Sequence, residues 1–292
     1  MKRREFLKFA LSSLLLGGMS KSIFAKEPPV VSVTEGKDYA AITRNVIAAL
    51  GGMQRFVKQG HVVVVKPNIG WDRRPEYAAT THPLVVRAIV EECIKAGAKK
   101  VKVFDNPCND PRRTYVNSGI LEALKGLRNV ELKHTENERF KNTKMNGVFL
   151  KEWPLYDEAL SADVFINVPV AKHHGLTRLT LGLKNIMGIM GGSRGYIHRS
   201  IDDALIDVNT VVKSHLVIID ATRILLDHGP QGGNLRDAKI LNRVIASTDI
   251  VAADAYATTL FNLHPQDIST TVTAYKRGMG EINLNKIRII KV

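Results

Sequence analysis

The sequence predicts an α/β protein: a mostly parallel sheet with helices on both faces, arranged in Rossmann-like layers. Short runs rich in β-branched residues, such as residues 62–65 and 216–219, are apolar at every position. Between such runs lie segments with apolar residues at helical spacing, as at Val46, Leu50 and Val57. Fully apolar strands are typical of sheets covered on both faces, and alternation of strands with helices favours parallel pairing.

Strands and helices alternate through the first half of the chain, and glycine or proline marks several of their ends. Gly51-Gly52 weakens the first helix in its middle. Pro83 suits the first turn of the second helix, and Gly97 stops that helix. The expected elements, in chain order, are a strand at 30–33, a helix at 38–58, a strand at 61–66, a helix at 83–96, a strand at 101–105, a helix at 114–127 and a strand at 130–133.

The second half alternates in the same way. Asn146-Gly147 is a turn dipeptide and predicts a hairpin. Leu176, Leu179 and Leu183 follow helical spacing. The expected elements are a hairpin at 141–153, a strand at 163–168, helices at 176–187 and 200–213, strands at 216–220 and 243–246, helices at 249–263 and through residue 275, and a strand at 286–291.

Residues 1–25 differ in character from the rest of the chain. A basic start, Lys2-Arg3-Arg4, precedes an apolar run of about a dozen residues, too short for an ordinary membrane span. Arg-Arg-x-Phe-Leu-Lys resembles a twin-arginine export signal; a general-secretion signal with a chance arginine pair is the alternative. We therefore expect the twin-arginine translocation machinery as a partner and a periplasmic or otherwise exported location. We expect no stable membrane span after cleavage, although the signal could instead be kept as an anchor.

The remaining chain, residues 26–292, is expected to form one α/β domain, with a division into two lobes near 135–160 left open. The formal net charge is +14, and removing the five Lys/Arg and one Glu of residues 1–25 leaves +10. Because an exported protein rarely meets nucleic acid, anionic small molecules, cell-wall polymers or lipid head groups are the expected partners. A basic surface that serves solubility alone is the alternative.

The two cysteines limit the cofactors that the chain can hold. Cys93 lies on the apolar stripe of a predicted helix and is expected in the core, whereas Cys108 lies in a loop. Two cysteines cannot form a four-thiolate iron–sulfur cluster or zinc site, so no iron–sulfur cluster is expected. The chain also has no Gly-x-Ser-x-Gly elbow, no His-Glu-x-x-His motif and no nucleotide-binding loop.

Four predicted strands end in a polar residue, namely Lys66, Asp105, Asn167 and Asp220. In an open parallel sheet the carboxyl ends of the strands share one edge, and ligands bind in the crevice at that edge. If the strands are parallel, these side chains converge from distant parts of the chain. Simple capping of strand ends is the alternative.

Residues 171–192 contain two adjacent histidines and no acidic residue. Lys172 and His174 precede the helix expected at 176–187, where free N–H groups and the helix dipole favour an anion. A polar stripe on that helix would add further contacts: Thr177, Thr180 and Lys184. These groups together suit a carboxylate or a phosphate, and a solvated helix face is the alternative.

Three histidines and one aspartate are further candidates for functional or buried polar roles. His174, His198 and His228 are candidate metal ligands or acid–base groups, although the sequence does not give their mutual distances. Asp254 lies in an apolar helix, and a buried charge needs a partner, so we expect a hydrogen bond or a lysine beside it.

Ordered motifs over residues 58–292 resemble the family known as domain of unknown function 362. They are Lys66-Pro-Asn68, Thr81-His82-Pro83, Asp105, Ser118-Gly119-Ile120, Lys172-x-His174, Lys184-Asn185, Gly188, Asp220, His228-Gly229-Pro230 and the run 246–254. The resemblance implies an α/β domain of unassigned activity. Some relatives add ferredoxin-like cysteine clusters, which this chain lacks. The family's layout is also similar to nickel-pincer lactate racemases, in which lysine and histidines surround a cofactor.

These observations predict an enzyme that acts on a small anionic substrate, of unassigned reaction type. The alternative is a metal- or cofactor-binding carrier or accessory protein of the cell envelope, and a purely structural envelope protein is a third reading. The expected catalytic residues are His174, His198, Asp105 and Asp220. The expected substrate-binding residues are Lys66, Asn68, Lys172, Thr180, Lys184, Asn185 and His228.

Overall fold

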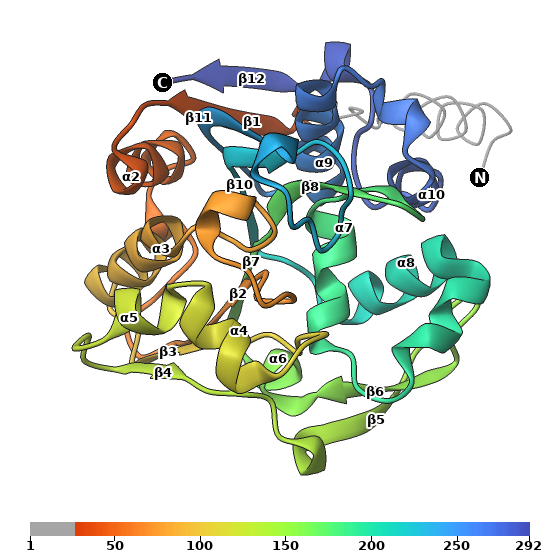
Figure 1. Cartoon of the computed structure of the whole chain (residues 1–292), viewed down its shortest axis with the longest axis horizontal. Coiled ribbons are helices and arrows are strands. Elements are labelled where there is room, and N and C mark those ends of the chain that lie inside the picture. The colour runs from red at the N-terminus through yellow and green to blue at the C-terminus, as the bar shows by residue number, and fades with distance from the viewer. Residues whose placement is uncertain (1–26) are drawn as a thin grey trace, which may run out of the picture.

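The structure, a computed structural model, describes residues 27–292 and is built around one large sheet (Figure 1). The predicted export signal lies outside the described residues. Ten strands form the sheet, in the order β12-β1-β11-β10-β7-β2-β3-β4, with β8 beside β10 and β9 beside β8. Their bounds are β1 (Val30–Glu35), β2 (Val62–Pro67), β3 (Lys100–Val103), β4 (Val130–Leu132), β7 (Val164–Val168), β8 (Val170–His174), β9 (Arg178–Thr180), β10 (Leu216–Leu225), β11 (Ala238–Ser247) and β12 (Arg288–Lys291).

Most neighbouring strands run parallel, which confirms the predicted fold class. β2 pairs in parallel with β3 and β7, β10 pairs in parallel with β7 and β8, and the pairs β3–β4 and β1–β12 are parallel as well. β11 is antiparallel to both β1 and β10, and β9 is antiparallel to β8. The carboxyl ends of β2, β3, β7 and β8 therefore face the same edge.

Helices cover both faces of the sheet (Figure 1). Successive residues of a strand point to opposite faces. Accordingly Val63 packs with α2 and α3, while its neighbour Val64 packs with α8. Ile218 and Ile219 likewise belong to hydrophobic clusters on opposite faces of the sheet. The helices are α2 (Tyr39–Ala49), α3 (Pro83–Lys95), α4 (Pro111–Asn117), α5 (Ile120–Leu124), α6 (Asp157–Ser161), α7 (Gly182–Asn185), α8 (Ile201–Val211), α9 (Ile250–Thr258) and α10 (Ser269–Lys276).

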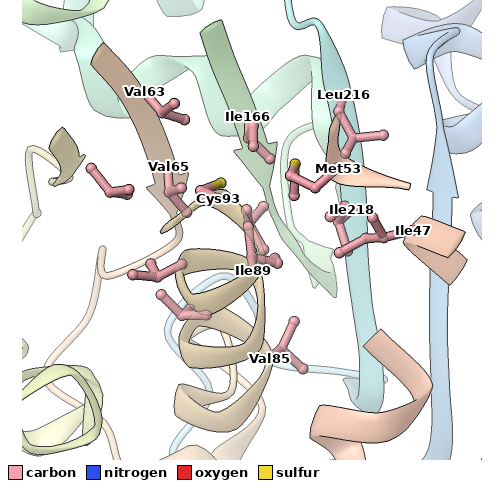
Figure 2. Close-up of a cluster of buried hydrophobic side chains, with 14 of the residues drawn as sticks. Ile47, Met53, Val63, Val65, Val85, Ile89, Cys93, Ile166, Leu216 and Ile218 are labelled. Carbon is pink, nitrogen blue, oxygen red and sulfur yellow. The ribbon is translucent and has the colours of Figure 1, made fainter. Parts of the chain in front are cut away.

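The core between the sheet and α2–α3 is built from interdigitated aliphatic side chains. Figure 2 shows Val85, Ile89 and Cys93 of α3 facing Val65 and Ile166 of the strands. Burial of the Cys93 side chain confirms its predicted place in the core. In the described part of the chain, both cysteines are free.

The predicted hairpin is confirmed as a separate two-stranded sheet, β5 (Phe140–Lys144) with β6 (Glu152–Tyr156). The Asp207 carboxylate of α8 accepts hydrogen bonds from three N–H groups of the connecting loop, Val148, Phe149 and Leu150. These bonds tie the hairpin to the main body.

Three predicted helices are wrong in their extent, and left-handed glycines explain two of them. The first helix ends at Ala49, since Gly51 and Gly52 adopt φ of 98° and 80°. The helix expected at 114–127 is two helices, α4 and α5, separated at Gly119 with φ of 73°. β10 and β11 extend to ten residues each, beyond the runs expected for them.

The helix expected at 176–187 is the largest error. The segment forms β9, then the four-residue α7, then a 3₁₀ turn over Ile186–Ile189. Leu179, Leu181 and Leu183 alternate along it and are buried, so Leu179 and Leu183 fit strand spacing as well as helical spacing, whereas Leu176 is exposed. The long helix N-terminus expected to hold an anion is therefore absent from this segment. Across residues 27–292 no helix is both long and apolar enough to span a bilayer.

Candidate functional site

A cavity of about 560 Å³ opens at the carboxyl ends of β2, β3 and β8. Among residues 27–292, its lining combines four cationic side chains with two histidines and one carboxylate, that of Asp105. Predicted site residues in the lining are Lys66, Asn68, Asp105, Lys172, His174, Thr180, Lys184, Asn185 and His198. Strand ends distant in sequence therefore meet at one place.

Lys66 and Asp105 form a buried ion pair at the base of the cavity. Lys66 Nζ lies 2.9 Å from Asp105 Oδ1, without the alignment of a hydrogen bond. Asp105 Oδ2 accepts from the Ile69 backbone N–H at 2.6 Å. Burial lowers the pKa of Lys66, and the Asp105 charge opposes that effect. A Cβ on Gly188 would fall 1.6 Å from Asp105 Oδ1, so this position requires glycine.

Asparagines hold the buried lysines in place. Asn185 Oδ1 accepts from Lys66 Nζ at 2.8 Å and from Asn68 Nδ2 at 3.1 Å. Asn185 Nδ2 donates to Asn167 Oδ1 at 2.8 Å and to the Lys66 carbonyl at 3.2 Å. With both ends of its amide engaged, Asn185 is suited to positioning the cations rather than to reacting.

Lys172 is buried beside this network. Its Nζ donates to Asn68 Oδ1 at 3.2 Å and to the Ala79 carbonyl at 2.6 Å. Burial lowers the pKa of Lys172 to about 7, against the opposing charge of Asp105. An amine that changes protonation near neutral pH is suited to general acid–base work.

Lys184 is the least satisfied cation of the cavity. Its side chain is 6% exposed, and the hydrogen-bond partner of Nζ among the described residues is the thioether sulfur of Met187, at 3.2 Å. Burial lowers the pKa of Lys184 to about 8. Nearby, Thr180 is 4% exposed and its Oγ1 has no protein partner within residues 27–292. A buried polar group without a partner is costly, so both groups favour a polar ligand.

His174 is held as a neutral hydrogen-bond donor. Its Nδ1 accepts from the backbone N–H groups of Leu176 and Thr177, at 3.1 and 3.3 Å. These two donors place the proton of the neutral ring on Nε2. Burial, followed by the charges of Lys184 and Lys172, lowers the pKa of His174 to about 3. The ring is therefore suited to donating a hydrogen bond from Nε2, not to accepting a proton there.

Two predicted site residues lie outside the cavity lining. Asp220 is within β10 rather than at its end, and its carboxylate accepts from the His82 N–H and from both donors of Thr222. The His228 side chain is 71% exposed and contacts Asp237 at 2.9 Å. Asp237 raises the pKa of His228 by this hydrogen bond.

The three histidines considered as metal ligands do not gather at one point. His174 and His198 line the cavity, whereas His228 lies outside it. His198 contacts the Gly195 carbonyl through Nδ1 at 3.1 Å. Over the chain from residue 27 onward, no group of three or more His, Cys, Asp or Glu side chains is arranged to hold a metal ion.

The lining also contains nine residues that were not among the predicted site residues, including Trp71, Cys108, Met187 and Arg194. Arg194 donates to the carbonyls of Asn106 and Pro107, at 2.8 and 2.9 Å, and so fixes the loop after β3. A loop rich in glycine flanks this arginine and was the sequence signal that could have drawn attention to it.

The predicted partner of Asp254 is confirmed as a pair of hydrogen bonds. The carboxylate accepts from the N–H groups of Gly182 and Leu183, at 2.7 and 2.9 Å. Burial nevertheless raises the pKa of Asp254 to about 7. The contact anchors α7, and with it Lys184 and Asn185, to α9.

Comparison with known proteins gives a family and a distant structural likeness. Residues 63–259 match the model described as "Domain of unknown function (DUF362)". A thylakoid-associated protein of Synechocystis sp. is 29% identical over 255 residues, 84% of this chain and 77% of that protein. Among solved structures, the lactate racemase apoprotein of Thermoanaerobacterium thermosaccharolyticum aligns with a TM-score of 0.49 and 13% identity, over 78% of this chain and 56% of that one. A Thermotoga maritima protein aligns with a TM-score of 0.46 and 12% identity, over 78% of this chain and 60% of that one.

Proposed function

The chain belongs to the family described as domain of unknown function DUF362, and we propose that it is an enzyme acting on a small carboxylate or phosphate bound in the cavity. The observation that carries the proposal is Lys184, a buried ammonium group with a thioether as its hydrogen-bond partner among residues 27–292. Asp202 acts on Lys184 only through its charge and forms no ion pair with it in the described chain. A buried cation without a counter-charge in contact is unfavourable, and an anionic ligand supplies that contact.

The neighbouring groups divide the work of binding. The Lys184 ammonium and the Thr180 hydroxyl, which has no partner among the described residues, bind anionic oxygens. The His174 Nε2–H donates to an oxygen of the same ligand and, being neutral, adds no charge of its own. Since Asp105 is already paired with Lys66, the carboxylate in the lining repels the ligand less than a free one would.

Lys172 is the group that we assign to proton transfer. With a pKa of about 7, it is present in both protonation states near neutral pH. A bound anion raises that pKa, so the ammonium form dominates at first and Lys172 begins as a general acid. This assignment replaces His174, one of the two histidines proposed from sequence, because its Nδ1 is occupied by two N–H donors.

Calorimetric titration with acetate and with inorganic phosphate tests the binding step. Lys184→Met keeps an unbranched side chain one atom shorter but removes its charge, and we expect affinity for the bound anion to fall about tenfold or more. Lys213→Met is the matched control, because Lys213 is exposed and does not line the cavity. Equal affinity in the wild type and in Lys184→Met, with both folded, would refute the proposal.

We also propose a subcellular location for the protein. The pair Arg3-Arg4 with the following Phe6-Leu7-Lys8 supports export by the twin-arginine route. The Synechocystis relative is named as thylakoid-associated, and we extend to this chain the idea of work at a membrane-bounded compartment.

A further inference from the structure

We propose that Cys108 is a modification site of the cavity, at which disulfides of small carboxylate-bearing thiols exchange with the Cys108 thiolate. The inference rests on the anion-binding part of the proposed function and needs none of its catalytic part. Lys184 and Thr180 serve both proposals as anion-binding groups, whereas neither binding nor proton transfer was assigned to Cys108 in the proposed function.

Cys108 is an exposed residue that lines the same cavity as three lysines. It follows β3 in a loop held by its own N–H to the Gly70 carbonyl, at 2.8 Å. Its side chain interacts electrostatically with the ammonium groups of Lys66, Lys172 and Lys184. An anionic reagent that enters the cavity is therefore drawn toward this thiol.

A second feature of the cavity points to a ligand independently of the cysteine. Lys184 and Thr180 are each more than nine-tenths buried and line the same cavity as Cys108. Met187 is the partner of the Lys184 ammonium in the described chain, and the Thr180 hydroxyl has no partner there. A carboxylate carried by the reagent would fill this gap while its sulfur faces Cys108.

The exchange balances without any further reactant. The Cys108 thiolate attacks one sulfur of the disulfide R–S–S–R, a Cys108–S–S–R bond forms, and the S–S bond of the reagent breaks. The leaving thiolate RS⁻ takes the electron pair and then a proton from water. The small disulfide is thus the oxidant, and a free thiol reverses the step. Because the group R occupies the cavity, the modified protein should no longer bind the anionic ligand.

Three small disulfides of similar size and different charge test this inference on the full-length protein. They are dithiodiglycolate, which is anionic, hydroxyethyl disulfide, which is neutral, and cystamine, which is cationic. Peptide mass spectrometry follows modification at each cysteine over time. We expect dithiodiglycolate to modify Cys108 about tenfold or more faster than hydroxyethyl disulfide, with cystamine slowest. Cys93 is the internal control and should stay unmodified, because it is buried.

High salt and one substitution test whether electrostatic attraction causes the faster modification by the anionic disulfide. High salt screens the attraction in the unaltered protein, and Lys184→Met removes part of it, so both should reduce the preference for dithiodiglycolate. Equal rates for the three disulfides, or a preference that salt leaves unchanged, would overturn the inference. Acetate binding to Cys108→Ser separates the two proposals. If Cys108→Ser binds acetate normally but the three disulfides modify Cys108 of the wild type at equal rates, this inference alone fails. If Lys184→Met binds acetate as the wild type does, the proposed function fails.

Discussion

At the scale of single residues, the protonation of each cavity group follows from its burial and its neighbours. Lys66 has a carboxylate beside it, whereas Lys184 has a thioether. Desolvation is the largest cause of the lowered pKa in both lysines and in Lys172. Because the pKa values of Lys172 and Lys184 lie at about 7 and about 8, ligand binding and proton uptake by these two groups are coupled.

The tautomer of His174 gives a prediction at this scale. Nitrogen NMR of the protein labelled in its histidines should show a neutral ring with the proton on Nε2 from about pH 5 to pH 8, because the pKa is lowered to about 3. His228 serves as the reference in the same spectra, since Asp237 raises its pKa and its ring should titrate. A His174 ring that becomes an imidazolium near its ordinary pKa would contradict this assignment.

At the scale of elements, short segments position the site. α7 has four residues, and it depends on α9 because Asp254 accepts from the first two N–H groups of α7. The loop after β3 is fixed by Arg194, which comes from the segment after α7. Isolated helices of this length are not stable in water, so tertiary hydrogen bonds set their geometry.

Removal of the Asp254 carboxylate should therefore destabilise the protein. Asp254→Ala leaves the N–H groups of Gly182 and Leu183 buried without partners, which costs about 2–4 kcal/mol of the free energy of unfolding. Glu122→Ala is the control, because that carboxylate is largely exposed on α5. Urea unfolding of the two variants measures the difference, and equal midpoints would show that α7 does not depend on this contact.

The elements also show where sequence reasoning succeeds and where it stops. Lys66 was predictable because it follows four consecutive valines that form a buried strand, and Asp105 because it comes shortly after the alternating Lys-Val-Lys-Val of β3. Asp220 was misplaced, since the apolar character resumes after it and β10 continues to Leu225. Leucines near residue 180 satisfy helical and strand periods at once, and tertiary contacts decide between them.

At the scale of the whole molecule, parallel topology collects the site from across the chain. Lys66 and His198 are separated by more than a hundred residues and line one cavity. No local sequence pattern predicts that residues so far apart in the chain lie close together in space. The shared edge of parallel strands does predict it for residues at the strand ends. The place of exposed loop residues such as His228 depends on the loop path, which no periodicity encodes.

Export is a property of the full chain and is tested there. Replacing Arg3 and Arg4 by lysine keeps the charge but removes the guanidinium pair of the twin-arginine motif. We expect the doubly substituted protein to remain in the cytosol while the wild type is exported, as measured by cell fractionation. Unchanged export of the double variant would favour the general-secretion alternative.

Binding-coupled proton uptake is the most direct measurement of the central claim. Acetate and sulfate, both fully ionised at pH of about 8, are titrated into the protein by calorimetry in two buffers that differ in ionisation enthalpy. A bound anion raises the pKa values of Lys184 and Lys172 above about 8 and about 7, so the protein should take up protons, and affinity should fall as the pH rises further. The Lys184→Met variant should bind weakly and take up fewer protons. Binding without proton uptake, or affinity that increases with pH, would contradict the account.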